Sequence, residues 1–258
     1  MGIHDSRPDP DLAEYCLRLG DDRLVLGHRL SEWCGHAPVL EEELALGNVA
    51  LDLLDQASLL LERSAELEGA GRSADDLAFF RDVTGFRNLL LVEQPNGDFA
   101  MTIARQYLFD VFDLHLAAGL QSSADSTLAS LSARIGKEAA YHVRHSGEWV
   151  LRLGDGTEES HRRMQAALDE LWTFTGEAFE ADDLVRRLVA ARVVVDPQAL
   201  HGPWRDQVLA TLAEAGLNAP DGAQPMQTGG RRGRHGEALG RMLSEMQSVA
   251  RAFPGASW

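Results

Sequence analysis

The sequence predicts an all-α protein, and three observations lead to this prediction. Long segments carry apolar side chains at the three- and four-residue spacing of an α-helix. β-branched residues cluster only at Val193, Val194 and Val195, so signals for strands are nearly missing. Of the 258 residues, 45% are hydrophobic and 25% are charged, which is the balance of a soluble globular protein.

Two long helices are expected at the start of the chain. The first covers about residues 11–33, with Gly20 as a candidate break. The second covers about residues 40–68, and Gly69 marks its end because glycine readily adopts the left-handed conformation that stops a helix. A short helix over about residues 74–81 and a long irregular connection follow.

Two further long helices are expected after this connection. The third covers about residues 99–120, and the fourth runs from a cap at Ser123 or Asp125 to about Leu153. Four long helices joined by short links and one long crossover predict a four-helix bundle of the ferritin-like kind. A helix over about residues 157–179 and shorter pieces add C-terminal helices outside the bundle.

We expect a single ferritin-like helical domain over residues 1–258. Its bundle core covers about residues 11–153, and a C-terminal helical extension covers about residues 157–258. The stretch 218–236, which is rich in glycine and proline, is the clearest loop.

The charge and the cysteine content restrict the partners and the compartment. The formal charge of −16 disfavours a general binder of nucleic acid, whose phosphates would be repelled. Cys16 and Cys34 cannot form a four-cysteine zinc site and favour a reducing compartment. No apolar run approaches the ~18 residues of a membrane span, so we expect a cytoplasmic protein without a membrane partner.

Polar residues interrupt the apolar stripes of all four long helices. On the fourth helix, steps of three and four residues from Leu128 reach Glu138, His142 and His145. The other helices place Gln106, Asp110, Asn48, Asp52 and Glu32 at matching positions. Buried polar groups need partners, so these residues predict either a metal site or a polar network in the core.

The spacing does not match a di-metal carboxylate site, which takes Glu-x-x-His from two of four helices. Residue 51, three after Asn48, is Leu51, and residue 141, three after Glu138, is Tyr141. A metal-free network is therefore favoured, and a degraded site using His142 stays open. Lys137, the only lysine, lies beside Glu138, where it could replace metal charge or be a solvated residue.

Two other segments have candidate functions. The loop residues Arg231, Arg232, Arg234 and His235 precede a predicted helix, whose N-terminus favours anions. They predict a contact with a phosphate group or an acidic partner, or form a solvated basic loop. The connection contains LLLVEQPNG (residues 89–97), whose apolar side chains require burial against the bundle or another subunit.

Four segments resemble a known family. They cover residues 26–57, 86–110, 137–157 and 228–247, and the motifs LLLVEQPNG and TGGRRG are their most specific parts. The chain resembles the C subunits of bacterial phenylacetyl-CoA 1,2-epoxidases, also called phenylacetate-CoA oxygenases. The likeness runs in register from the first helix to the C-terminal tryptophan.

The resemblance implies a ferritin-like bundle that serves as a non-catalytic structural subunit in phenylacetate catabolism. It implies pairing with a catalytic A subunit, whose di-iron centre epoxidises the ring of phenylacetyl-CoA, and action with a reductase that uses NADPH. No cofactor is then expected in this chain. The core network would descend from ligand positions: Glu32, Asn48, Asp52, Gln106, Asp110, Glu138 and His142.

Two alternatives remain at this point. One is a self-sufficient di-metal oxidase or oxygenase that uses Glu32, Asp52, Asp110, Glu138 and His142. The other is a pure scaffold without an associated CoA enzyme.

Overall fold

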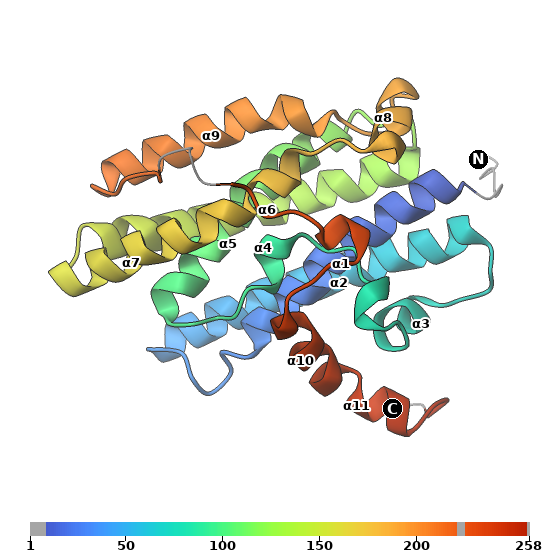
Figure 1. The fold of residues 1–258 in the computed structure, drawn as a ribbon, viewed down its shortest axis with the longest axis horizontal. Helices are drawn as coiled ribbons and strands as arrows, with labels where there is room; N and C mark the ends of the chain where they lie inside the picture. The colour runs from blue at the N-terminus through green and yellow to red at the C-terminus, as the bar shows by residue number, and fades with distance from the viewer. Residues whose placement is uncertain (1–8, 221–224, 257–258) are drawn as a thin grey trace. The chain divides into compact units, whose positions relative to one another are not determined.

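The computed structural model describes residues 9–220 and 225–256, and all regular structure within these ranges is helical (Figure 1). The chain forms two compact units. Unit 1 comprises Met1–Glu93 and Gly229–Trp258, and unit 2 comprises Gln94–Thr228. The sequence predicted one division, between the bundle core and the C-terminal extension at residues 153–157. The two units instead divide after Glu93 and after Thr228.

Unit 1 is built on an antiparallel pair of long helices, α1 (Pro10–Ser31) and α2 (Leu40–Glu68), which lie side by side (Figure 1). The backbone N–H of Asp9 donates to the carbonyl of Leu67 at 3.1 Å, which joins the start of α1 to the end of α2. The shorter elements of this unit are α3 (Ala74–Phe79), α4 (Leu90–Glu93), α10 (Glu237–Met246) and α11 (Ser248–Ala252).

The helix α1 runs through Gly20 without the break that the sequence allowed. A Cβ atom at this position would lie 2.9 Å from Cδ2 of Leu61, so the glycine lets α1 and α2 approach closely. The predicted end of α2 is confirmed, because Gly69 caps it with φ of 68°.

Unit 2 contains the antiparallel helices α5 (Phe99–Leu120) and α6 (Ser126–Gly154). Asp98 caps α5 by accepting from the N–H of Met101 at 2.9 Å, and Asp125 caps α6 by accepting from Leu128 at 2.7 Å. Three further helices belong to this unit: α7 (Glu158–Leu171), α8 (Asp183–Ala190) and α9 (Pro197–Glu214).

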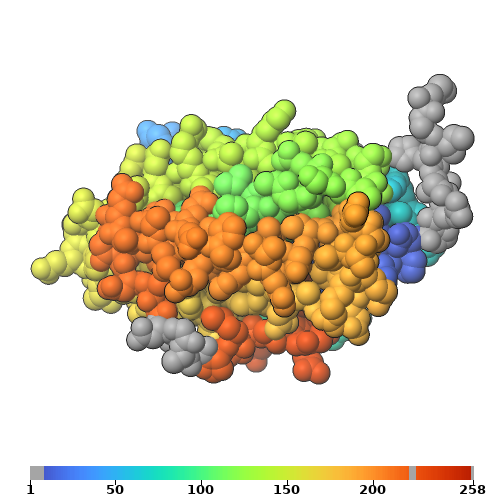
Figure 2. Space-filling model, turned by 90° about the horizontal axis from the view of Figure 1, so that it is seen from above, coloured from blue at the N-terminus to red at the C-terminus, as the bar shows by residue number. Residues whose placement is uncertain are grey.

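The helix expected over residues 157–179 ends earlier, at Leu171, and short 3₁₀ turns continue to Phe179. These turns bring Trp172 and Phe179 against Trp204 of α9, with ring centroids 5.6 and 5.1 Å from it. The outer surface of α9 (orange) lies beside that of α6 in Figure 2. The aromatic cluster therefore packs the turns that follow α7 against α9.

The predicted fold class, an all-α bundle of the ferritin-like kind, is confirmed. The four long helices occupy the expected segments almost residue for residue. One helix bears on the expectation that no apolar run approaches the length of a membrane span, namely α2. By length and composition alone this helix could cross a membrane, with a mean hydropathy of 1.4 over 18 residues.

Candidate functional site

A buried polar cluster joins α5 to α6 in unit 2, and Asp110 lies at its centre. The side-chain amide of Gln106 donates to Oδ1 of Asp110 at 2.6 Å, and the hydroxyl of Ser146 donates to Oδ2 at 2.7 Å. All three side chains are buried, as is His142 one turn before Ser146. The cluster fixes the register of two helices through neutral donors.

The environment of Asp110 favours its protonated form. Burial raises the pKa of this carboxyl to about 7, although the charge of His142 and the two hydrogen bonds oppose the rise. The nearby carboxylate of Asp113 adds to the increase. A buried carboxyl that changes charge near neutral pH is the main electrostatic feature of this cluster.

The structure brings together three of the seven predicted network residues, namely Gln106, Asp110 and His142. The prediction is wrong for Glu32 and Asn48, which are exposed, because Glu32 follows the end of α1 as its C-cap and Asn48 lies on the outward side of α2. Asp52 and Glu138 are only partly buried. Glu138 pairs with Arg134 at 3.2 Å on α6 itself.

Ser146 is the member of the cluster that the sequence reasoning missed. It follows His142 by four residues and therefore lies on the same face of α6. A small polar residue at that spacing is the signal that could have identified it.

The described side chains do not fit a di-iron site. Among the residues that the structure describes, no group of three or more His, Cys, Asp or Glu side chains is arranged to hold a metal ion. Both carboxylate oxygens of Asp110 already accept hydrogen bonds, and Glu138 pairs with an arginine. Lys137 is exposed on α6 and does not extend the buried cluster.

The basic loop before α10 was predicted to use four residues for one contact, but two of them turn inward. Arg231 turns inward and donates to both oxygens of Asp22 on α1, at 3.0 and 2.7 Å. Burial raises the pKa of Asp22, and the Arg231 guanidinium opposes this rise. The prediction of a phosphate contact is therefore wrong for Arg231, because its guanidinium is already engaged within unit 1.

His235 also turns inward, and the anion that this segment binds is the chain's own Glu93. Nδ1 of His235 lies 2.7 Å from Oε2 of Glu93, and the N–H of Gly236, which caps α10, donates to Oε1 at 2.7 Å. The preference of a helix N-terminus for an anion is thus satisfied internally. Arg232 and Arg234 remain exposed, and for them the contact stays a prediction.

A second acidic residue of α1, Asp21, is also buried and was missed by the sequence reasoning. It pairs with Arg81 and accepts from the backbone N–H of Arg87 at 2.8 Å. The run Asp21-Asp22-Arg23 between the apolar residues of the middle of α1 is the signal that indicates buried ion pairs. The burial predicted for LLLVEQPNG is confirmed for residues 89–93.

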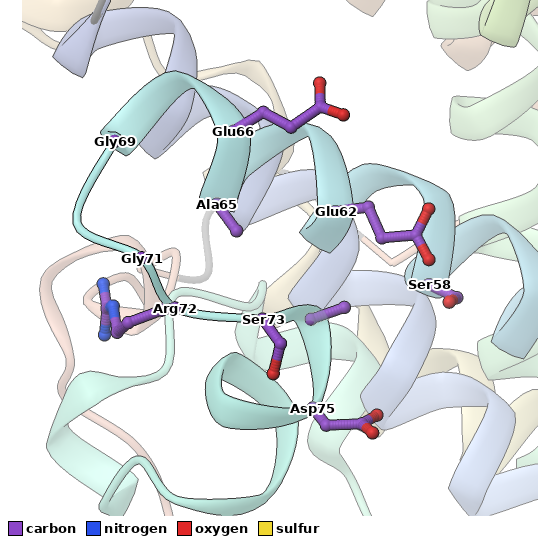
Figure 3. A pocket seen from close by; sticks show the side chains of 10 residues that line it. Ser58, Glu62, Ala65, Glu66, Gly69, Gly71, Arg72, Ser73 and Asp75 are labelled. Atoms are coloured by element: carbon purple, nitrogen blue, oxygen red, sulfur yellow. The ribbon is translucent and has the colours of Figure 1, made fainter.

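A surface hollow of about 640 Å³ lies between the end of α2 and α3 (Figure 3). Its polar lining includes Glu62, Glu66 and Asp75, whose side chains are exposed. Arg72 at its edge donates to Glu68 at 2.8 Å. The hollow therefore presents solvated, partly neutralised charges and no buried polar group.

Two comparisons with known proteins identify relatives of this chain. A family model described as phenylacetic acid catabolic protein matches residues 4–258. The chain is 51% identical over 247 residues to the C subunit of the 1,2-phenylacetyl-CoA epoxidase of Escherichia coli (strain K12). The alignment covers 96% of this chain and 99% of that protein. The resemblance found in the sequence is confirmed, and the chain belongs to the family of phenylacetic acid catabolic proteins.

Proposed function

We propose that this chain is the non-catalytic structural C subunit of a phenylacetyl-CoA 1,2-epoxidase and pairs with a catalytic A subunit. The observation that carries the proposal is the 51% identity to the C subunit of the Escherichia coli epoxidase. Because the alignment extends over 96% of this chain and 99% of that protein, we infer the same fold and the same role for this chain.

In this proposal the di-iron centre belongs to the A subunit, and this chain contributes no cofactor. The Asp110 cluster supports this division, because its donors are an amide and a hydroxyl that satisfy the carboxylate oxygens directly. Such a network orders the helices that carry it, since both carboxylate oxygens of Asp110 have a fixed partner. The contribution of this chain is then a rigid helical surface for its partner.

The outer face of α2 is the surface that we assign to the A subunit. Leu40, Leu44 and Leu51 form a stripe on this face, and their exposed fractions are 67%, 60% and 66%. No atom lies within 4 Å of the Cβ position of Gly47, which is in the middle of the stripe. Large exposed apolar side chains at helical spacing are typical of a protein interface.

The charges beside this stripe indicate the chemistry of the partner. Glu41 and Glu43 lie next to Leu40 and Leu44 at the start of α2. A matching surface would therefore combine apolar side chains with arginine or lysine at one end. A lipid surface fits less well, because acidic residues next to the stripe would be repelled by anionic headgroups.

The role assignment is tested by reconstitution with phenylacetyl-CoA, NADPH and the reductase. We expect no epoxidation by this chain alone and activity when the A subunit is added. Epoxidation by this chain without the A subunit would reverse the assignment.

The surface assignment is tested by Leu44→Asp and Leu51→Asp, with Val249→Asp as the matched control. Val249 is 52% exposed on α11 of the same unit. Burial of a leucine contributes about 1.5 to 3 kcal/mol, so each α2 variant should bind the A subunit at least about tenfold more weakly. Equal affinity of the α2 variants and the control, measured by calorimetry, would exclude this face.

The self-sufficient di-metal alternative is tested by elemental analysis after expression with added iron. We expect far less than one iron per chain. Two bound irons per chain would overturn the non-catalytic role.

We also propose a cytosolic location and further contacts within the complex. The reductase and further epoxidase subunits are expected partners. Arg232 and Arg234, which are exposed, are the candidate contacts to a phosphate of the CoA ester. The charge of −16 argues against a nucleic-acid partner.

A further inference from the structure

Residues 229–247 form a strap that returns to unit 1 after the chain has completed unit 2. Arg231 fastens its start to Asp22, and the side-chain amide of Gln247 fastens its end to the carbonyls of Ala78 and Arg81, both at 3.0 Å. His235 lies between these two points, and its side chain is only 1% exposed.

The contacts of His235 define its protonation state. Nε2 lies 3.0 Å from the carbonyl oxygen of Phe86, which can only accept, so Nε2 carries a proton. Nδ1 faces Oε2 of Glu93 at 2.7 Å. The amide of Asn88 and the N–H of Gly236 also donate to Glu93, so both of its oxygens act as acceptors. An ionised carboxylate only accepts, so Nδ1 carries a proton as well, and the ring is an imidazolium.

The charged groups around His235 come from every element packed against it. Glu93 of α4 faces it directly, and Asp21 of α1 acts from further away while paired with Arg81. Two arginines donate to the backbone carbonyls of the residues that His235 contacts. Arg87 shares the carbonyl of Phe86 at 2.8 Å, and Arg29 donates to the backbone carbonyl of Glu93 at 2.9 Å.

The balance of these groups favours the charged ring. Burial lowers the pKa of His235, but the hydrogen bonds to Glu93 and Phe86 and the charges of Glu93 and Asp21 raise it above its ordinary value. A histidine with a raised pKa in the folded state stabilises the fold at low pH and loses that effect as pH rises.

We propose that the buried His235–Glu93 pair is a pH-sensitive catch that holds the C-terminal strap on unit 1. When the ring loses a proton, Nδ1 keeps the proton that faces the carboxylate of Glu93, and the lone pair of Nε2 then faces the carbonyl oxygen of Phe86 at 3.0 Å. This repulsion releases the strap around Gly236, so Glu93 and the N-terminus of α10 become accessible to solvent. The catch is closed below the ordinary pKa of histidine and weakens as pH rises above it.

The sign of the effect follows from proton linkage. The open strap exposes His235 with an ordinary pKa near 6.5, and the closed strap raises that pKa. Closure is therefore favoured fully below about pH 6.5 and weakens as pH rises through the raised value. Each unit by which the closed pKa exceeds the open one gives a tenfold larger opening constant at high pH.

The first measurement is the titration of the imidazole nitrogens of the ¹⁵N-labelled full chain by NMR. His235→Gln identifies the signal, and His36→Gln, at an exposed turn of the same unit, is the control. We expect both nitrogens of His235 to be protonated at pH 6.5 and to titrate above that value. A neutral His235 ring at pH 6.5 would overturn the proposal.

The second measurement is amide hydrogen exchange of the strap from pH 6 to 9, corrected for the intrinsic rate. The amide of Gly236 reports directly, because Glu93 is its acceptor. We expect protection of the strap to fall as pH rises above 6.5 while protection in α2 stays constant. Strap protection that is independent of pH in the wild-type chain would exclude the catch, whatever the variants do.

Glu93→Gln separates the catch from general packing. The glutamine keeps the size of the side chain but removes the charge that holds the second proton on the ring. We expect the pKa of His235 to fall below 6.5 and the exchange step between pH 6.5 and 9 to disappear. An unchanged step in Glu93→Gln would assign the pH dependence to another group and contradict the proposal.

Discussion

Buried carboxylates in the two units are neutralised in different ways. Asp21 and Asp22 of unit 1 each accept from an arginine, Arg81 and Arg231 respectively. Asp110 of unit 2 accepts from an amide and a hydroxyl, which carry no charge. A buried carboxyl without a cationic hydrogen-bond partner holds its proton to higher pH, and this difference leads to the first prediction.

Asp110→Asn should remove a pH dependence of stability. The pKa of Asp110 is about 7 in the folded state and near 3.9 when unfolded, so its stabilising effect is present below about pH 4 and is lost as pH rises through 7. At about 1.4 kcal/mol per pKa unit, the loss approaches roughly 4 kcal/mol. The asparagine can keep one acceptor and offer a donor to the buried Oε1 of Gln106, which has no partner.

Urea unfolding at pH 5, 6, 7 and 8 tests this prediction. The free energy of unfolding of Asp110→Asn should vary less with pH and exceed that of the wild type at pH 8. A variant that is less stable than the wild type at pH 8 would contradict it.

Arg231→Ala should destabilise unit 1. It leaves the buried carboxylate of Asp22 without its arginine, and breaking one side of a buried ion pair costs about 3 to 5 kcal/mol. Arg232→Ala is the matched control, because Arg232 is the adjacent residue and is exposed. Thermal unfolding of both variants is the measurement, and an equal loss of stability would show that the Asp22 contact contributes little.

Helix packing depends on which of two neighbouring stripes faces inward. On α6, one stripe passes through Leu131, Glu138 and His145, and the other through Ser132, Ala139 and Ser146. Both share Leu128, Ile135 and His142, because three- and four-residue steps alternate in a helix of 3.6 residues per turn. The structure buries the second stripe, since its small side chains and the hydroxyl of Ser146 allow close contact with α5.

Gly20→Val in α1 should destabilise the α1–α2 pair. The new side chain would meet Leu61, whose Cδ2 lies 2.9 Å from the Cβ position, and overpacking costs about 1 to 3 kcal/mol. Gly47→Ala in α2 is the contrast, since its Cβ position is open and alanine favours helix by about 0.5 to 1 kcal/mol. The unfolding midpoint in urea should fall for the first variant and rise for the second. A fall for both would show that glycine is needed in this pair for another reason.

At the scale of the whole molecule, the chain carries a formal charge of −16, from 40 acidic and 24 basic residues. Two copies of this chain therefore repel each other at low ionic strength, whereas a partner with basic surface residues is attracted. Arg231 and His235 each pair internally with an acidic residue, Asp22 and Glu93, so these pairs leave the excess of exposed acidic charge in place.

The association rate with the A subunit should fall as salt increases from 0.05 to 0.5 M, because the Debye length shortens and screens the attraction. Stopped-flow fluorescence measures this rate, and light scattering at 0.05 M should find no self-association of the isolated chain. An association rate that is independent of salt would show that the interface is not electrostatically steered.

The sequence by itself determined the helices, their order and the family of this protein. Periodicity located α2 and α5 to the residue, and Gly69 marked the end of α2, whereas Ser123 and Asp125 were both candidates for the cap of α6. These features depend on neighbours within a few positions along the chain, so local patterns record them. The motifs LLLVEQPNG and TGGRRG identified the family for the same reason.

Only the tertiary structure decided which polar residues meet. Asp22 and Arg231 are 209 positions apart, and Glu93 and His235 are 142 apart, so no local pattern could pair them. These long-range contacts also hold residues 231–235 against unit 1, where the sequence predicted a loop at the surface. A residue's partner is chosen by the packing of whole elements, and packing depends on contacts that a single sequence does not display.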